Sequence, residues 1–209
     1  MTPHTPRTPR TPGTPGTPGT PTPLLREPLA VRRFGQHFTP EEIADPDAVW
    51  PSDGPHEWGE RCCGLACLRM LLDFHGLAVP DRLPLLHHGL ALGAHTPQGW
   101  LHAGLVRLAA AYGLQGHASP FGGPEPLQEL AAAGTPSIVS CSFRFPEDGR
   151  KGGHLVLFTG EFDKDGEVYA GFADPSRWGA DHTAVPAARF WSSWTGRAVV
   201  LTPVGESAA

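Results

Sequence analysis

Hydrophobic residues in the first half of the chain are arranged as they are in helices. Residues 63–75, with the sequence CGLACLRMLLDFH, are rich in Leu, Met and Ala on every face, and Gly76 follows where a helix C-terminus favours glycine. This pattern predicts a central, buried helix. A second helix is predicted over 97–112, with Thr96 as its N-cap, and a shorter third helix over 126–133.

The second half of the chain has the short apolar runs that are typical of strands. The segment 163–166, with the sequence DKDG, is a favourable hairpin turn between two of them. Residues 29–59, which are rich in Pro, Asp and Trp, predict an irregular segment before the first helix. Helices followed by antiparallel strands indicate an α+β architecture. The expected strands cover residues 137–143, 154–158, 167–172 and 197–202.

The N-terminal region has a composition of its own. Residues 2–23 repeat a Thr-Pro triplet, and proline at every third position predicts an extended, disordered segment. We therefore divide the chain into a Thr/Pro-rich tail at 1–28 and one domain at 29–205, whose size suits a single hydrophobic core. The sequence has no apolar run long enough for a transmembrane helix and no secretory signal, so we expect a cytoplasmic protein.

Charge is distributed unevenly along the chain. Residues 1–33 contain five arginines and one glutamate, whereas the remainder carries nine more acidic than basic side chains, and the formal net charge is −5. Nucleic-acid binding depends on a basic surface that displaces counterions, and the acidic domain has no cluster of Lys or Arg. The composition therefore opposes nucleic-acid partners and favours partners of neutral or basic character.

The four cysteines are Cys62, Cys63, Cys67 and Cys141. Without an export signal a disulfide framework is not expected, and the C-C-x3-C spacing does not match a structural zinc motif. We therefore expect no metal and no cofactor. Cys63 begins the predicted buried helix, where free backbone N–H groups and the helix dipole stabilise a thiolate. Taken alone, a buried structural cysteine is the more common interpretation.

His154 and Asp174 are the candidate partners of this cysteine. His154 follows two glycines and opens a predicted strand, and Asp174 ends the partner strand of the same hairpin. Antiparallel pairing would bring the two side chains together, so that Asp174 accepts a hydrogen bond from His154. Each residue alone has a plain explanation, as a surface histidine or an Asp-Pro turn. Together with Cys63 they form the set of nucleophile, base and orienting acid that a cysteine hydrolase needs.

Three strings of the sequence resemble a known family. ERCCGLACLRMLLDFHGLAVP resembles the nucleophile helix of the double-glycine cysteine peptidases that process bacteriocin leaders (peptidase family C-thirty-nine), which have the pattern D-C-G-x-A-C-L. GGHLVLFTG and FADPS resemble the His strand and the Asp-Pro of the same family. The resemblance covers roughly residues 55–178. It implies a papain-like fold, in which the nucleophile helix packs on a C-terminal antiparallel sheet.

The resemblance also implies roles for individual residues. Cys63 is the nucleophile, His154 the general base and Asp174 the orienting acid of a cysteine-type peptidase. Cys67 matches a structural cysteine of the family. Cys62 stands where the family usually has Asp, and no role is assigned to it.

One position departs from the family pattern. Its members usually have a glutamine six residues before the nucleophile, whose amide donates to the oxyanion, and here the same count reaches Glu57. An ionised carboxylate cannot donate and would repel the oxyanion. Either a buried, protonated Glu57 or a neighbouring donor, His56 or Trp58, would then replace the amide. An ordinary loop glutamate without a catalytic role is the plain alternative.

The implied activity is hydrolysis of a peptide bond in a peptide or protein substrate, after small residues and in a leader peptide. Two other classes of function stay open. A papain-like module that binds a peptide without cleaving it is favoured by Glu57, and an acyl transferase would use the same three residues. Because no membrane segment is predicted, coupling to export requires a separate transporter or biosynthetic partner.

Overall fold

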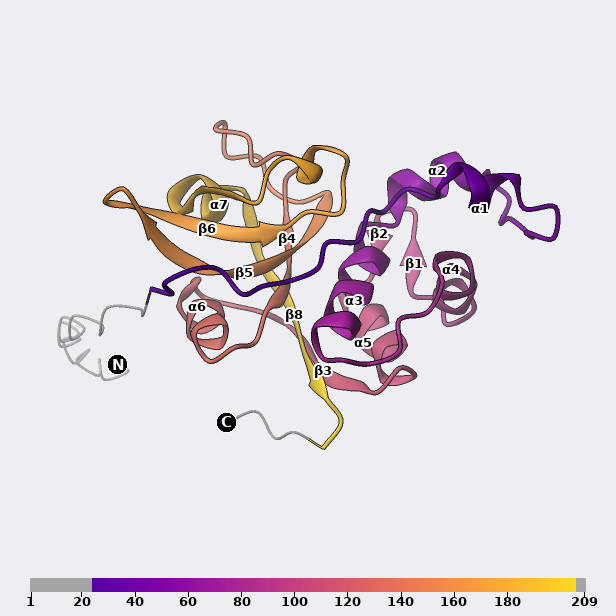
Figure 1. Ribbon diagram of the computed structural model, residues 1–209, viewed down its shortest axis with the longest axis horizontal. Coiled ribbons are helices and arrows are strands. Elements are labelled where there is room, and N and C mark those ends of the chain that lie inside the picture. Colours follow the sequence, from indigo (N-terminus) through magenta and orange to yellow (C-terminus); the bar gives the residue numbers. More distant parts are fainter. Residues whose placement is uncertain (1–23, 206–209) are drawn as a thin grey trace, which may run out of the picture.

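The computed structural model describes residues 24–205, and the predicted disorder of the Thr-Pro repeat lies outside them (Figure 1). The larger of the two sheets in these residues has six antiparallel strands, in the order β3-β8-β4-β5-β6-β7. The elements are α1 (Pro40–Ala44), α2 (Gly54–Arg61), α3 (Cys63–Phe74), α4 (Arg82–Ala91), β1 (His95–Thr96), β2 (Gly99–Trp100), α5 (His102–Ala110), β3 (Leu114–Pro120), α6 (Glu125–Ala132), β4 (Ser137–Cys141), β5 (His154–Lys164), β6 (Glu167–Ala173), a 3₁₀ turn (Trp178–Ala180), β7 (Ala184–Pro186), α7 (Ala187–Ser193) and β8 (Trp194–Pro203).

The two faces of the sheet are covered by different helices, as Figure 1 shows. Side chains of successive strand residues point to opposite faces of the sheet, so a strand can contribute side chains to the hydrophobic core on each face. We call α1 to α5 with the hairpin β1–β2 the helix half, and the six-stranded sheet with α6 and α7 the sheet half. The residues that pack against α3, α4 and α5 include Ile138, Leu155, Leu157, Val199 and Leu201, and those that pack against α6 and α7 include Val139, Val156, Phe158, Ala198 and Val200.

The helix predicted over residues 63–75 is confirmed as α3, and it is central to the helix half. Its side chains Leu68, Met70, Leu71 and Leu72 are fully buried. The helix lies close to the sheet at its beginning, because a Cβ on Gly64 would lie 3.0 Å from Leu155 Cδ1 of β5. Because Gly64 has no side chain, the start of α3 can pack tightly against the sheet.

The helix predicted over residues 97–112 is shorter than expected. Residues 95–100 form the hairpin β1–β2, and α5 begins only at His102, so Thr96 is not an N-cap. Gly99 has a φ of +111°, which a helix does not accommodate, and this glycine was the local signal for a turn. The short helix predicted over 126–133 and the strands predicted over 137–143, 167–172 and 197–202 are confirmed with small shifts of their ends, whereas the strand predicted over 154–158 continues to Lys164 as β5.

The segment 29–59 is also more regular than predicted. Thr39 caps α1 in a capping box, in which its hydroxyl accepts from the backbone N–H of Glu42 and the Glu42 carboxylate accepts from the backbone N–H of Thr39. Helix α2 then runs directly up to Cys62. The prediction of an irregular lead-in therefore holds for residues 29–39 and 45–53, which lie before and between these helices.

Residues 24–38, which we call the strap, connect the two halves. In Figure 1 the strap is the indigo segment that runs along the sheet half and continues into the helix half. The backbone N–H groups of Leu25, Leu29 and Gln36 donate to carbonyls of the sheet half, at 2.8–2.9 Å. The predicted domain boundary after residue 28 falls inside this segment.

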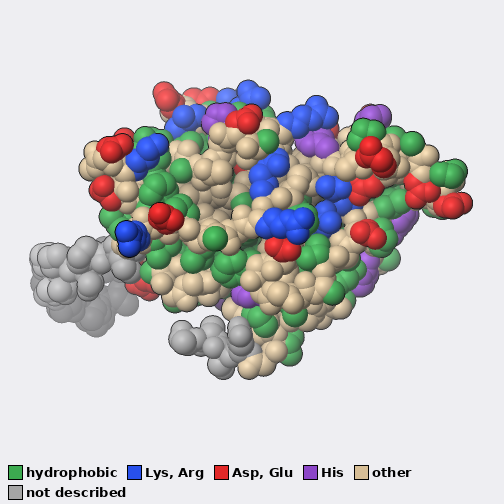
Figure 2. Space-filling view, viewed as in Figure 1, with side chains coloured by type: hydrophobic (Ala, Val, Ile, Leu, Met, Phe, Trp, Pro, Cys, Tyr) green, Lys and Arg blue, Asp and Glu red, His purple; other side chains and the backbone are tan. Residues whose placement is uncertain are grey.

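Charged side chains are grouped on the surface. Figure 2 shows Asp and Glu gathered at the end formed by α1 and its neighbouring loops, and Lys and Arg across the middle of the same face. The strap crosses that middle region in the same view, and the side chain of its Arg32 is 73% exposed. Among the described residues, no helix has the length and hydrophobicity to cross a bilayer.

Candidate active site

Cys63 is the first residue of α3 and follows the N-cap residue Cys62. The first backbone N–H groups of a helix have no partner within it, and they carry the positive end of its dipole. No acidic residue stands in the first turn of α3 to oppose this effect. Cys63 is partly exposed, so a substrate can reach its sulfur at the N-terminal end of the helix.

The other three cysteines lie in environments that suppress reactivity. Burial raises the pKa of Cys62 to about 12, and it raises the pKa values of Cys67 and Cys141 well above that of a free thiol. The Cys67 Sγ atom donates a hydrogen bond to the carbonyl of Leu155, 3.4 Å away. These cysteines are therefore buried thiols of the core, and among the four only Cys63 is open to a substrate.

His154 is held at the first position of β5 by the turn that precedes it. Gly152 and Gly153 have φ values of +83° and +90°, in the left-handed region that side chains disfavour. The two glycines therefore let the chain turn sharply into β5. His154 pairs with Cys141 of β4 and is only 7% exposed.

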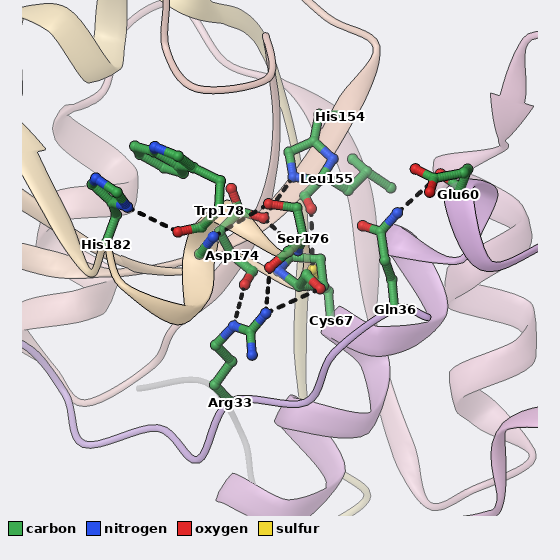
Figure 3. A network of polar contacts seen from close by, with 12 residues as sticks. Arg33, Gln36, Glu60, Cys67, His154, Leu155, Asp174, Ser176, Trp178 and His182 are labelled. Carbon is green, nitrogen blue, oxygen red and sulfur yellow. Dashed lines mark hydrogen bonds and ion pairs between the residues drawn. The ribbon is translucent and has the colours of Figure 1, made fainter. Parts of the chain in front are cut away.

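Asp174 meets His154 through the register of β5 and β6. Leu157 pairs with Ala173, so the next residue, Asp174, lies diagonally across from His154 on the same face. His154 Nε2 lies 2.8 Å from Asp174 Oδ1, and the backbone N–H of Ser176 donates to the same oxygen at 2.7 Å (Figure 3). Because the carboxylate accepts from Nε2, Nδ1 is the ring nitrogen that is left to interact with Cys63.

The charges of this set support one another. Burial alone would lower the pKa of His154, but its hydrogen bonds with Asp174 and Cys63 and their charges outweigh burial and raise the pKa to about 9. Burial alone would raise the pKa of Asp174. The hydrogen bond and charge of His154, together with the N–H of Ser176, outweigh burial and lower the pKa of the carboxyl. At neutral pH the arrangement thus favours an imidazolium beside an ionised Asp174.

Cys63 and His154 border the same cleft, which has a volume of about 960 Å³. Trp58 and Trp100 line it from the helix half, and Leu155 lines it from the sheet half. A second hollow of about 330 Å³ shares His154, Gly153 and Glu60 with the first. The two hollows therefore adjoin each other at His154.

Glu57 does not reach this cleft, which corrects the oxyanion position expected from the sequence. Its side chain is exposed and borders a separate hollow together with His56, whereas Trp58 borders the cleft of Cys63. The segment before Cys63 is helical, and a helix advances 1.5 Å per residue, less than half the rise of an extended chain. A count of six residues therefore leads to a different place than it would in an extended segment.

Gln36 is the site residue that sequence reasoning missed. It is 4% exposed and borders the smaller hollow with His154. Its Nε2 atom donates to the carbonyls of Gly59 and Glu60, at 3.1 and 2.9 Å, while its Oε1 atom has no partner among the described residues. Because it lies 27 residues before Cys63, separated by α1 and α2, no count from the nucleophile finds it.

Trp58 carries another free polar group at the cleft. Its ring is 5% exposed, and its Nε1 atom has no hydrogen-bond partner among residues 24–205. Buried donors without a partner are rare in folded proteins. The indole N–H is therefore available to a carbonyl oxygen in the cleft.

Comparisons with known proteins agree with this geometry at the level of the fold. No family model and no curated protein matches the sequence. Among solved structures, a double-glycine-motif protease domain of an AMS/PCAT transporter, in complex with its leader peptide, shares 21% identity and a TM-score of 0.53, over 87% of this chain and 98% of that chain. A putative C39-like peptidase from Bacillus anthracis shares 18% identity and a TM-score of 0.52, over 70% of this chain and 90% of that chain. The chain therefore has the papain-like fold of these double-glycine peptidase domains.

Proposed function

We propose that the protein is a cysteine peptidase that cleaves a peptide bond through Cys63, His154 and Asp174. The observation that carries the proposal is the 2.8 Å contact of His154 Nε2 with a fully buried Asp174 carboxylate, while His154 and the partly exposed Cys63 border one cleft. This is the order of orienting acid, base and nucleophile that activates a thiol. The fold shared with the double-glycine protease domains supports the same activity.

The reaction begins from the pair in which His154 already holds the Cys63 proton on its ring, as an imidazolium beside the Cys63 thiolate. The thiolate attacks the carbonyl carbon of the substrate, so that a C–S bond forms and the carbonyl oxygen becomes an oxyanion. The C–N bond then breaks, and His154 gives its proton to the leaving amine. Water attacks the thioester while His154 accepts a proton from it, and breakage of the C–S bond releases the acid and restores the thiol.

The oxyanion needs donors that point to it before the reaction begins. The backbone N–H of Cys63, free in the first turn of α3, is the first donor. We assign the second to Gln36, because it is a buried amide that borders a hollow with His154, and the resemblance implies that an amide side chain donates to the oxyanion, although it places that amide at residue 57. One of its N–H groups would leave the carbonyl of Gly59 or Glu60 to bind the oxyanion. Trp58, with its free Nε1–H, is the alternative donor.

The substrate is proposed from the family resemblance and from the neighbouring structures. One of these is bound to a leader peptide, and its description names a double-glycine motif. We therefore propose a leader peptide cut after small residues as the substrate, with a separate transporter or biosynthetic enzyme as the partner. The substitution at Glu57, which favoured a non-catalytic binding module, loses its weight because Glu57 lies outside the cleft.

The first experiment is alkylation of Cys63 by iodoacetamide as a function of pH, followed by peptide mass spectrometry. Fast labelling well below pH 8.5, the pKa of a free thiol, and slower labelling in His154→Ala are the expected results. The matched control is His182→Ala, a histidine that is exposed and contacts Trp178 through its carbonyl and its ring. An ordinary thiol profile in the parent protein would overturn the proposal.

Cleavage itself is tested with peptides that carry a Gly-Gly site, in the parent protein and in Cys63→Ala. The masses of the products separate hydrolysis from transfer, because an acyl transferase would yield an adduct with an added amine. Binding without any product, in a protein whose Cys63 is activated, would favour the binding module.

A further inference from the structure

The guanidinium of Arg33, a strap residue, is placed against the turn that carries Asp174. Its Nε atom donates to the carbonyl of Asp174 at 2.6 Å, and its Nη2 atom donates to the carbonyls of Pro175, at 3.3 Å, and Ser176. Figure 3 shows the side chain rising from the strap toward these carbonyls. One planar fork therefore holds three consecutive peptide units.

The same turn is packed closely on its other side. A Cβ on Gly179 would lie 2.5 Å from Asp174 Cβ and 2.2 Å from its carbonyl oxygen, so the glycine is in direct contact with the residue. The backbone N–H of Ser176 also donates to the Asp174 carboxylate. Asp174 lies at the end of β6, beyond the last residue paired with β5, so contacts outside the sheet have to fix it.

The strap joins this turn to the segment before the nucleophile. Close to Arg33, the backbone N–H of Gln36 donates to the Pro175 carbonyl at 2.9 Å. The Gln36 side chain donates to Gly59 and Glu60 at the end of α2, which leads directly into Cys62 and α3. A stretch of four strap residues thus contacts both halves of the candidate site.

We propose that Arg33 is a positioning residue of the active site, which fixes the turn after β6 so that the Asp174 carboxylate holds the His154 ring toward Cys63. Arg33 acts on the backbone of the turn, because its donors reach carbonyl oxygens and none of its hydrogen bonds goes to the carboxylate. The inference rests on the proposed function for its catalytic meaning, but the geometry it describes can be measured without turnover.

The test compares Arg33→Met with Arg32→Met. Methionine keeps much of the apolar stem and removes every donor, while Arg32 is an exposed neighbour whose ion pair with Asp73 has a separation of 3.6 Å. The rate of Cys63 alkylation is measured against pH for both variants. We expect Arg33→Met to lose roughly tenfold in rate at pH 6–7 and to move toward an ordinary thiol profile, and Arg32→Met to match the parent.

A second readout separates failure of this inference from failure of the proposed function. The titration of the His154 ring, followed by NMR, is expected near pH 9 in the parent and at lower pH in Arg33→Met, because a displaced Asp174 supports the imidazolium less well. If the parent thiol proves unreactive, the proposed function fails, and the ring titration still decides the role of Arg33.

Arg33→Gln covers the case in which Arg33→Met does not fold. Its shorter amide has two N–H donors and reaches fewer carbonyls, so its alkylation profile and ring titration are expected between those of the parent and Arg33→Met. A folded Arg33→Met, or a folded Arg33→Gln, with the parent profile and the parent ring titration would overturn the inference.

Discussion

The nucleophile and its partners are held by different kinds of structure. Cys63 is partly exposed at the start of one helix, and residues next to it in sequence determine its position. His154 and Asp174 are 7% and 0% exposed and meet through pairing of two strands, 20 residues apart in sequence. The nucleophile has to be reached by a substrate, whereas its partners have to keep one orientation, and burial differs accordingly.

The four cysteines also differ in how exposed they are to solvent. Cys62 and Cys63 are adjacent, yet burial raises the pKa of Cys62 to about 12, and only Cys63 borders the cleft. A difference of one position therefore separates a core thiol from a candidate nucleophile. Environment, more than residue type, decides which cysteine can react.

The largest effect is expected from Cys63→Ala. Turnover of a cleavable peptide should fall by at least about 10⁴-fold, because the reaction has no other nucleophile in place. The melting temperature should change little, since the residue is partly exposed. Activity assays with thermal melts measure both. Cys62→Ala is the control, and loss of activity there with retention in Cys63→Ala would place the nucleophile at residue 62.

A smaller effect is expected from the oxyanion donors. Gln36→Ala should reduce kcat by about 10²–10³-fold, whereas Glu57→Gln should leave the rate unchanged or slightly higher, because Glu57 points away from the cleft. Steady-state kinetics at one pH suffice, with thermal melts to confirm that Gln36→Ala is folded. If Trp58→Phe loses more than Gln36→Ala, the second donor is the indole.

The charge of Asp174 can be removed while its shape is kept. In Asp174→Asn the alkaline limb of kcat/KM, expected near pH 9 in the parent, should move to lower pH by at least about one unit, equivalent to about 1.4 kcal/mol. The reason is that the lost carboxylate no longer stabilises the imidazolium. The exposed Asp181→Asn is the matched control, and an unmoved limb in Asp174→Asn would mean that this charge does not support His154.

The free energy of unfolding should depend on pH through the pair of His154 and Asp174. The pKa of His154 is about 9 in the folded protein against 6.5 for a free histidine, so its contribution is complete below pH 6.5 and is lost as pH rises to 9. The loss is of the order of 3 kcal/mol. Urea unfolding at pH 6 and pH 9.5, compared with His154→Gln, measures it. Equal pH dependence in the two proteins would contradict the coupling.

Local sequence determined the elements whose signals lie within a few residues. The apolar stretch 63–75 and Gly76 define α3, and the DKDG turn defines the β5–β6 hairpin, so both could be predicted. The hairpin brought His154 and Asp174 to the same end of two paired strands, and a register shift between Phe158 and Gly160 sets the pairing that places them on one face. Order along the chain was therefore sufficient to predict that the two strands pair, whereas the register shift, which the sequence did not reveal, decided which side chains share a face.

Other elements were hidden because competing local signals or distant contacts decide them. Helix α4 contains Pro84 and Gly89, which argue against a helix locally. Gly89 is needed there because a Cβ would lie 2.7 Å from the Trp100 ring, a contact that exists only after the hairpin β1–β2 has folded against α4. Tertiary packing of this kind outweighs the low helix propensity of Pro and Gly. It produces no repeating pattern of apolar residues from which the helix could be predicted.

The sequence by itself determined which residues have the chemistry of a cysteine hydrolase: Cys63 at a helix start, and His154 and Asp174 on one hairpin. Only the tertiary structure decided which other residues surround them. Gln36 and Arg33 come from the strap, 23 and 141 residues away from Gly59 and Asp174, to which they donate, whereas Glu57 borders a different hollow. The physical reason is that side chains meet through the path of the folded backbone, and distance along the chain does not specify that path.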